Sequence, residues 1–221
     1  MIPREQLASA QIPGGGVMTL FSRGEDFMIN VDRDELMSTR MNGSEEALAT
    51  MTARRLKGRA GQNWLIGGYG MGFTLRAALA SAPKDAKFTV AELVPEIVDW
   101  AKGPMAALTG DSLARKAVTI RIGDVAEAIE EGGWDAILLD VDNGPDGLVR
   151  ESNEGLYSDT GLAIARRALK RGGVLAIWSA ANDDKFARRL SAAGFRVEEE
   201  VVRARQNGKG PRHIIWFATP R

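Results

Sequence analysis

Apolar and polar residues follow two different patterns along this chain. Residues 17–39 combine short runs rich in Val, Ile, Phe and Met with polar breaks at RGED and DRDE, which predicts a small antiparallel hairpin or meander. From Glu45 onward, short apolar runs alternate with segments of helical periodicity. Such alternation predicts βαβ units and a mostly parallel sheet with helices on both faces.

The alternating region divides into strands and helices of ordinary length. We expect strands at 63–68, 87–93, 117–124, 134–140 and 173–180, and helices at 45–57, 73–81, 95–102, 125–131, 158–170 and 183–194. Two further strands, joined through QNGKGPR, are expected to form a closing hairpin over 195–220. The chain is therefore expected to contain a short N-terminal β extension, 1–44, and a larger α/β domain, 45–221.

Composition argues against several classes of partner and site. Lys plus Arg (29) equals Asp plus Glu (29), so the chain lacks the basic excess that nucleic acid or an anionic membrane requires. No cysteine is present, which excludes disulfides and thiolate metal sites. The start, MIPREQLASAQIPGGG, lacks the apolar core of a signal peptide, and no run of 18 apolar residues occurs. We expect a cytoplasmic protein with no nucleic-acid or membrane partner.

Four glycines interrupt the join between the first alternating strand and its helix. In LIGGYGMGFTL, Gly67, Gly68, Gly70 and Gly72 precede a helix expected to begin near Phe73. A tight turn of this kind exposes backbone N–H groups at a helix N-terminus, where a ligand can approach closely. The alternative is that the glycines only allow tight packing of the helix on the strand.

Acidic residues follow the next strands at the same edge of the predicted sheet. Glu92, followed by Leu93, ends a strand about 20 to 25 residues after the glycine turn, where nucleotide-binding folds hold ribose hydroxyls. Asp124, followed by Val125, suits an adenine amino group, and Asp140 follows the fourth strand. Ligands bind outside the strand carboxyl ends of open parallel sheets, so these residues are expected to share one crevice. The alternatives are a helix cap or surface acid at Glu92 and a helix cap at Asp124.

Several motifs together resemble a known family. IGGYGMG, AELVPEIVDWA, IGDVAEAI, WDAILLDVDNGPDG and LYSDTGLAIARRALKRGGVLAIW are similar to the class I S-adenosylmethionine-dependent methyltransferase fold, and within it to the spermidine synthase (polyamine aminopropyltransferase) branch. The resemblance covers roughly residues 17–200. It implies a Rossmann-like sandwich with a mostly parallel seven-stranded sheet and a C-terminal antiparallel hairpin, preceded by a shortened N-terminal β-domain. It also implies a homodimer.

The resemblance assigns roles at matching positions. The four glycines would line the amino-acid end of S-adenosylmethionine or its decarboxylated form, and Glu92, with Leu93 beside it, would hold the ribose hydroxyls. Asp124 and Val125 would contact the adenine. Asp140 stands where the family's catalytic aspartate stands.

Two departures from the family pattern concern the substrate. Spermidine synthases usually read GGGDGG at the turn, and the resemblance assigns its Asp to the amine of the aminopropyl group, whereas Gly70 stands here. The acidic loop after the fourth strand reads DVDNGP, so only Asp142 could take the part of the second acid. A turn without an acid repels the carboxylate of intact S-adenosylmethionine less, and the intact cofactor is the methyl donor. We therefore expect methyl transfer to a small molecule in preference to aminopropyl transfer.

The expected chemistry is displacement at a carbon bound to a sulfonium. An amine acceptor must be neutral to attack, and Asp140 could orient it and take up its proton, with Asp142 adding a polar contact and Tyr157 closing the acceptor pocket. The alternatives are a turn at DNGPDG and a packing role for Tyr157. A further hypothesis is a non-catalytic relative that only binds a nucleoside.

Two other segments carry weaker signals. His213 is the single histidine and has no second histidine with which to share a metal, so we expect it to be structural and predict no metal site. Met41 to Glu46 is typical of a helix N-terminus with Ser44 as the cap, although the segment falls where spermidine synthases carry residues that face the pocket.

Overall fold

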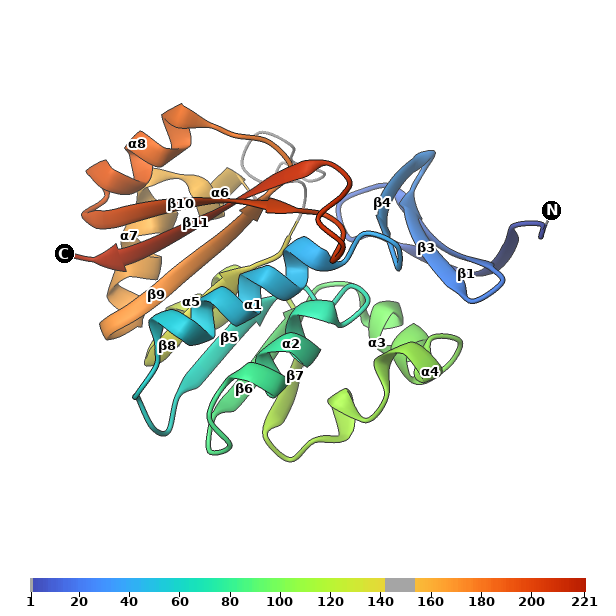
Figure 1. Cartoon of the computed structure of the whole chain (residues 1–221), viewed down its shortest axis with the longest axis horizontal. Helices are drawn as coiled ribbons and strands as arrows, with labels where there is room; N and C mark the ends of the chain where they lie inside the picture. Colours follow the sequence, from blue (N-terminus) through green and yellow to red (C-terminus); the bar gives the residue numbers. More distant parts are fainter. Residues whose placement is uncertain (1, 142–153) are drawn as a thin grey trace.

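The computed structural model describes residues 2–141 and 154–221 (Figure 1). The chain starts with a separate antiparallel sheet of four strands in the order β1-β2-β3-β4. Its strands are β1 (Glu5–Gln11), β2 (Val17–Arg23), β3 (Asp26–Val31) and β4 (Asp34–Ser38). The meander expected at 17–39 is present, and β1 adds a strand ahead of it. The sequence of β1, EQLASAQ, is mostly exposed and carries little apolar pattern, so its pairing with β2 rests on the backbone ladder.

The second sheet has seven strands in the order β10-β11-β9-β8-β5-β6-β7. The five parallel strands are β5 (Asn63–Gly67), β6 (Lys87–Glu92), β7 (Val118–Ile122), β8 (Trp134–Leu139) and β9 (Leu169–Ser179). The last two, β10 (Phe195–Arg203) and β11 (Arg212–Pro220), are antiparallel to each other, and β11 is also antiparallel to β9. This arrangement confirms the fold class predicted from the sequence.

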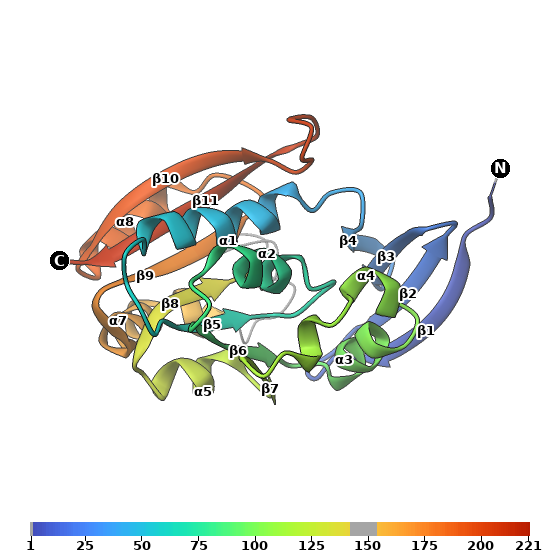
Figure 2. The ribbon, with the colours of Figure 1, turned by 60° about the horizontal axis from the view of Figure 1, so that its bottom comes forward.

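Helices cover both faces of this sheet (Figure 2). They are α1 (Gly43–Arg55), α2 (Phe73–Ser81), α3 (Pro95–Lys102), α4 (Ala106–Thr109), α5 (Val125–Glu130), α6 (Glu154–Tyr157), α7 (Asp159–Ala168) and α8 (Asp184–Ala192), with a short 3-10 helix, η1 (Ser112–Ala114). Trp64 and Ile66 of β5 pack in the core with α1, α2 and α3, whereas Leu65 faces the opposite core with α5, α7 and α8. Within the described ranges, no helix combines the length and apolarity needed to cross a membrane.

The strand order brings the ends of β5 and β8 together. The chain moves outward from β5 through β6 to β7 and then returns to the other side of β5 at β8, so the order reverses between β5 and β8. Open α/β sheets bind ligands in the crevice at such a point. Gly68 follows β5 with φ of +83°, and a Cβ there would lie 2.7 Å from the carbonyl oxygen of Asp140. Only glycine lets the two strand ends approach this closely.

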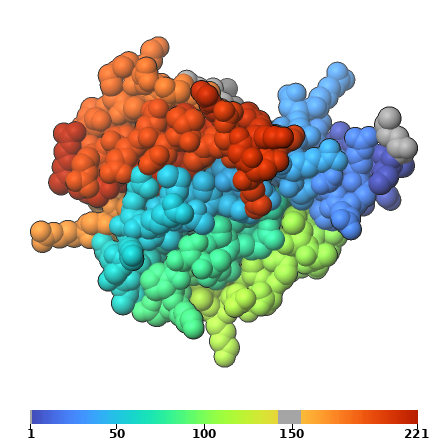
Figure 3. Space-filling model, viewed as in Figure 1, coloured from blue at the N-terminus to red at the C-terminus, as the bar shows by residue number. Residues whose placement is uncertain are grey.

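The closing hairpin returns the chain to the same edge of the sheet. Because β11 runs antiparallel to β9, Ile214 near its start pairs with Ser179 at the end of β9. The tip between β10 and β11 packs on the first turn of α1, where Gly43 N–H donates to the Ala204 carbonyl at 2.8 Å. In the space-filling view the red hairpin lies against the light-blue start of α1 (Figure 3). The hairpin therefore forms one wall beside the carboxyl ends of the parallel strands.

Candidate functional site

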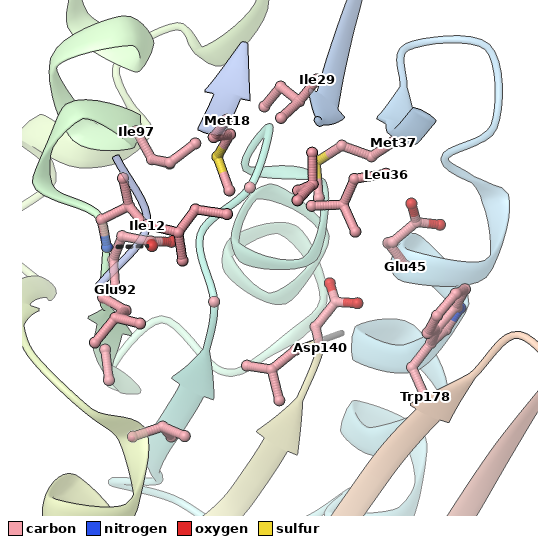
Figure 4. A pocket seen from close by; sticks show the side chains of 18 of the residues that line it. Ile12, Met18, Ile29, Leu36, Met37, Glu45, Glu92, Ile97, Asp140 and Trp178 are labelled. Carbon is pink, nitrogen blue, oxygen red and sulfur yellow. Dashed lines mark hydrogen bonds between the residues drawn. The ribbon is translucent and has the colours of Figure 1, made fainter. Parts of the chain in front are cut away.

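A cavity of about 320 Å³ lies between the two sheets, at the carboxyl ends of the parallel strands (Figure 4). Three groups of side chains form its walls. The strand ends of the large sheet contribute Gly68, Gly70, Glu92, Leu93, Asp124, Val125, Asp140 and Val141. The N-terminal sheet and the segments that flank its strands contribute Ile12, Met18, Ile29, Val31, Leu36 and Met37, and the third wall contains Glu45, Trp178 and His213.

The four glycines of the turn divide into two pairs. Gly68 and Gly70 line the cavity. Gly67 and Gly72 serve close packing, because a Cβ on Gly67 would lie 2.8 Å from Val125 Cγ2 and one on Gly72 would lie 2.6 Å from the hydroxyl of Tyr69. Both expectations for the glycines, close approach of a ligand and tight packing, thus correspond to features of this turn.

Glu92 is a buried carboxylate held by backbone donors. Its Oε2 accepts from the N–H of Tyr69 at 2.8 Å and its Oε1 from the N–H of Val94 at 2.9 Å. Burial raises its pKa, and these backbone hydrogen bonds partly oppose the rise. The backbone N–H groups of Gly70 and Leu93 also lower the pKa of Glu92, which lies beside Leu93 in the cavity lining and presents its carboxylate as an acceptor for hydroxyl groups.

Asp124 stands at the start of α5 and also borders the cavity. Its Oδ1 accepts from the N–H of Ala126 at 2.9 Å, the geometry of a helix N-cap. The adjacent Val125 is buried and lines the cavity. The capping role and a position beside a ligand therefore coexist at Asp124, as the sequence allowed.

Glu45 and Asp140 place two carboxyl groups on one part of the cavity (Figure 4). Thr74 Oγ1 donates to Asp140 Oδ2 at 2.5 Å, yet burial raises the pKa of Asp140 to about 6. Burial, and then the charge of Asp140, raise the pKa of Glu45 to about 8. The described lining contains no Lys or Arg and five acidic residues: Glu35, Glu45, Glu92, Asp124 and Asp140. The part of the cavity that contains Glu45 and Asp140, called the acidic wall below, is therefore suited to a cation.

Ser44 connects Glu45 to the C-terminal hairpin. The prediction that Ser44 caps the helix is wrong, because α1 begins at Gly43 after Asn42 and Ser44 lies in its first turn. The Ser44 hydroxyl is instead 2.7 Å from Glu45 Oε2 and 2.8 Å from His213 Nδ1. The His213 ring meets Trp178 edge-on with centroids 4.8 Å apart, and burial lowers the pKa of His213.

His213, expected to be structural, is thus a cavity residue. Glu45, His213 and Trp178 come from α1, β11 and β9, which are far apart in sequence. For Glu45, the likeness of the 41–46 segment to pocket-facing residues of spermidine synthases was a signal. For Trp178 and His213 the sequence contained no signal that they would line the cavity.

The structure describes only one of the other two residues predicted for the acceptor site. Tyr157 is buried against Phe186, with ring centroids 5.6 Å apart, and is absent from the described cavity lining. Its hydroxyl reaches the carbonyl of Val141 at 3.5 Å, so it packs behind the cavity wall. Asp142 lies outside the described residues.

Met37 occupies the space next to the glycine turn. Gly70 has φ of +53°, and a Cβ there would lie 2.9 Å from Cε and 3.0 Å from Sδ of Met37. The side of the turn on which spermidine synthases carry an acid is therefore apolar here. Together with Ile12, Met18 and Leu36, Met37 forms an apolar wall that faces the acidic strand ends.

Comparisons with known proteins agree with this architecture. No protein-family model matches the chain, and no curated protein matches it. Solved structures do: a spermidine synthase in complex with the transition-state analogue AdoDATO aligns over 98% of this chain and 73% of its own, with a TM-score of 0.75 and 17% identity. The spermidine synthase of Thermotoga maritima aligns with the same coverage, a TM-score of 0.76 and 17% identity.

A third structure, a probable spermidine synthase from Corynebacterium glutamicum, aligns over 99% of this chain and 80% of its own, with a TM-score of 0.68 and 14% identity. The class defined by these comparisons is a Rossmann-like α/β fold with a separate N-terminal antiparallel sheet. Within that class, the chain has the fold of the spermidine synthases, including the N-terminal antiparallel sheet.

Proposed function

We propose that this protein is an aminopropyltransferase that uses decarboxylated S-adenosylmethionine and an amine acceptor. The observation that carries the proposal is the pair of carboxyl groups, Glu45 and Asp140, in a cavity whose described lining contains no Lys or Arg. The fold of the structural neighbours, named as spermidine synthases, supports the same conclusion.

The charge of the cavity distinguishes the two donors. Decarboxylated S-adenosylmethionine carries a sulfonium and an ammonium, and both are attracted by the acidic wall. The intact cofactor carries in addition a carboxylate, which would approach Glu45 and Asp140 with no Lys or Arg among the described lining residues to neutralise it. This argument reverses the preference drawn from Gly70 alone, because the acid missing from the turn is replaced by Glu45 on α1.

The residues on the other side of the cavity fit the nucleoside of such a donor. Glu92 presents its carboxylate as an acceptor for the ribose hydroxyls, and Asp124 with Val125 offers an acceptor and an apolar contact for the adenine. When bound, the donor supplies an electrophilic carbon next to its sulfonium. The protein therefore has mainly to hold the acceptor nitrogen at attacking distance from that carbon.

Glu45 and Asp140 then perform the proton chemistry of the acceptor. The Asp140 carboxylate attracts the amine in its ammonium form, and Glu45 in its deprotonated form takes a proton from it, since its pKa is raised to about 8. The neutral nitrogen forms a bond to carbon as the carbon–sulfur bond breaks, and the electron pair stays on sulfur. The apolar wall of Met18, Leu36 and Met37 keeps water from the reacting atoms.

Methyl transfer is the second candidate function. The observation that favours it is the apolar contact between Gly70 and Met37, which leaves no acid on the glycine turn. A methyltransferase would use the same nucleoside site and the same pair of carboxyl groups for an amine acceptor. The two functions differ in which form of the donor binds more tightly.

Parallel calorimetric titrations with S-adenosylmethionine, its decarboxylated form and methylthioadenosine test the proposal. We expect the decarboxylated donor to bind at least about tenfold more tightly than the intact one, and Glu45→Gln to reduce that preference. Glu46→Gln is the matched control, since Glu46 bonds Gln206 outside the cavity. Tighter binding of the intact cofactor would favour methyl transfer, and no binding of any of the three would leave only a fold relative.

A further inference from the structure

A chain of hydrogen bonds leads out of the cavity through Ser44. Glu45 Oε2, Ser44 Oγ and His213 Nδ1 are joined by contacts of 2.7 and 2.8 Å. Ser44 is fully buried and Glu45 is largely buried, whereas His213 is half-buried and lines the cavity. The chain therefore connects the Glu45 carboxyl group to a more exposed imidazole.

The Ser44 hydroxyl has one proton for two neighbours, so only two arrangements satisfy all three groups. In the first, protonated Glu45 donates to Ser44 Oγ and Ser44 donates to an unprotonated His213 Nδ1. In the second, His213 Nδ1–H donates to Ser44 Oγ and Ser44 donates to the Glu45 carboxylate. The two arrangements differ by the passage of one proton from Glu45 to His213.

We infer that Ser44 and His213 form a proton outlet for Glu45, which carries the proton lost by the acceptor amine from the closed cavity to solvent. This inference rests on the proposed function. It adds Ser44 and His213 to the residues of the proposed mechanism, as positioning residues that act through Glu45 rather than on the reacting carbon.

One transfer through the outlet balances as follows, and exchange of the ring proton from Nδ1 back to Nε2 through water then returns His213 to the first arrangement. The amine gives its proton to Glu45, Glu45 gives a proton to Ser44 Oγ, and the Ser44 proton moves to His213 Nδ1. The resulting imidazolium releases its Nε2 proton to water, so that His213 ends neutral with its proton on Nδ1. Burial lowers the pKa of His213 and so favours this release.

The groups around His213 are compatible with this role. Trp178 of β9 packs on the imidazole ring, and Val202 is its pairing partner on β10. The charged groups nearest along the strands are Arg212 and its pairing partner Arg203, which donates to the Gly210 carbonyl. On α1, Glu46 is bonded to Gln206. Arg212 and Arg203 lie on the opposite face of the hairpin from His213, because successive residues of a strand alternate in direction. The charges that act on Glu45 are those of Asp140 and Glu46.

Nitrogen NMR of the imidazole tests the outlet in the free protein, without donor or acceptor. His213 is the single histidine, so its two ring nitrogens give unambiguous signals. Glu45 has its pKa raised to about 8, so we expect the proton of neutral His213 to lie on Nε2 below that pH and on Nδ1 above it. The exchange of the two nitrogen shifts should occur in wild type and in Glu46→Gln, and should vanish in Ser44→Ala. Unchanged shifts between about pH 6.5 and 9.5 in wild type would overturn the inference.

Steady-state transfer to an amine separates the outlet from a structural role. We expect Ser44→Ala and His213→Asn to lower kcat roughly 10- to 100-fold with the donor KM within about twofold, and imidazole to restore part of the activity of His213→Ala. Ser81→Ala, which also removes a hydroxyl bonded within a helix, is the control. Wild-type kcat in Ser44→Ala would overturn the outlet alone. A wild-type protein that transfers no aminopropyl group would overturn the proposed function, and the outlet as a catalytic device with it, even if the tautomer exchange is present.

Discussion

At the residue scale, two positions determine the charge of the cavity near the glycine turn: Gly70, which has no side chain, and Glu45, which carries a carboxyl group. Gly70 leaves room for Met37, and Glu45 supplies a carboxyl group from a different element. Burial is the main cause that raises the pKa of both Glu45 and Asp140; the charge of Asp140 raises the pKa of Glu45 further, whereas the hydrogen bond from Thr74 lowers that of Asp140. Donor preference and stability therefore depend on the same few atoms.

Restoring an acid at the turn should sharpen donor selection. Gly70→Asp places a carboxylate in the cavity beside Met37, whose flexible end can move. We expect the preference for the decarboxylated donor to rise about tenfold, at a cost of about 1 to 2 kcal/mol in the free energy of unfolding because φ is +53°. Gly70→Ala, with the same backbone cost and no charge, separates the two effects. Equal donor preference in both variants would show that the turn does not contact the amino-acid end of the donor.

Removing the Glu45 charge should stabilise the free protein at high pH. The raised pKa of Glu45, about 8, means that the folded state holds a proton which the unfolded state loses near its ordinary value of 4.5. Stability is therefore present at low pH and falls as pH rises from about 4.5 to 8. We expect Glu45→Gln to raise the free energy of unfolding by about 2 kcal/mol near pH 9 and to change it little near pH 4. Urea unfolding at the two pH values checks this, and an equal change at both would contradict it.

The sequence predicted the part of the site that belongs to consecutive strands. Glu92, Asp124 and Asp140 each follow an apolar strand, and the parallel topology alone brings such positions together. It could not predict that β11 would return His213 to Ser44, a contact between residues 169 positions apart. That contact depends on how the hairpin packs on α1, which no local pattern records.

At the scale of elements, the hairpin tip and the start of α1 act as one unit. A Cβ at Gly43 would lie 2.8 Å from the carbonyl carbon of Arg205, and Gly43 N–H is bonded to Ala204. The next two residues along α1 are Ser44 and Glu45. A shift of the hairpin therefore moves both the cavity acid and its neighbour His213.

Gly43→Ala should disturb the cavity through this contact. Because the added methyl group meets backbone atoms that cannot rotate away, we expect a loss of about 1 to 3 kcal/mol in the free energy of unfolding and weaker binding of the decarboxylated donor. Gly155→Ala on α6, where a Cβ meets no heavy atom of the described residues within 4 Å, is the control and should leave binding unchanged. Wild-type binding by Gly43→Ala would show that α1 and the hairpin are not coupled.

Most elements of the larger sheet were predictable because each combines an apolar run with a clear break. The helix at 73–81 has the predicted bounds, and the helix expected at 158–170 ends at Ala168 because β9 already begins at Leu169. The short helices α4 and η1 carry too few residues to show a period, and β1 has too few buried positions to show alternation. Their positions depend on tertiary contacts.

At the scale of the whole molecule, the cavity and a buried cluster of charged groups lie at opposite ends of the sheet. The cavity is at the carboxyl ends of the parallel strands, and at their amino ends the buried Asp135 bonds Arg59, Lys170 and the N–H of Asn63. Burial on its own raises the pKa of Asp135, but the hydrogen bond from Lys170, the Asn63 N–H and the two cations hold that pKa below its ordinary value. This cluster joins three segments of the chain.

Asp135→Asn should weaken the fold without touching the cavity. A carboxyl group with a lowered pKa adds stability above its ordinary pKa and loses it as pH falls, so we expect a loss of about 2 kcal/mol near pH 7 that shrinks below about pH 4. Donor affinity at fixed temperature should be unchanged. The control is Asp111→Asn, which removes an exposed ion pair with Arg115 and should cost at most about 0.5 kcal/mol. Loss of donor binding by folded Asp135→Asn would contradict the separation of the two ends.

The insertion of β11 between β9 and β10 also orders events during synthesis. A ribosome delivers β5 to β9 first, and these strands pair with one another as they emerge, whereas β10 has no partner in the sheet until β11 has been made. His213 is the last of the described cavity residues to be translated. A nascent chain therefore contains Glu45, Glu92, Asp124 and Asp140 before His213 has been made, so the part of the cavity wall that β11 contributes is completed last.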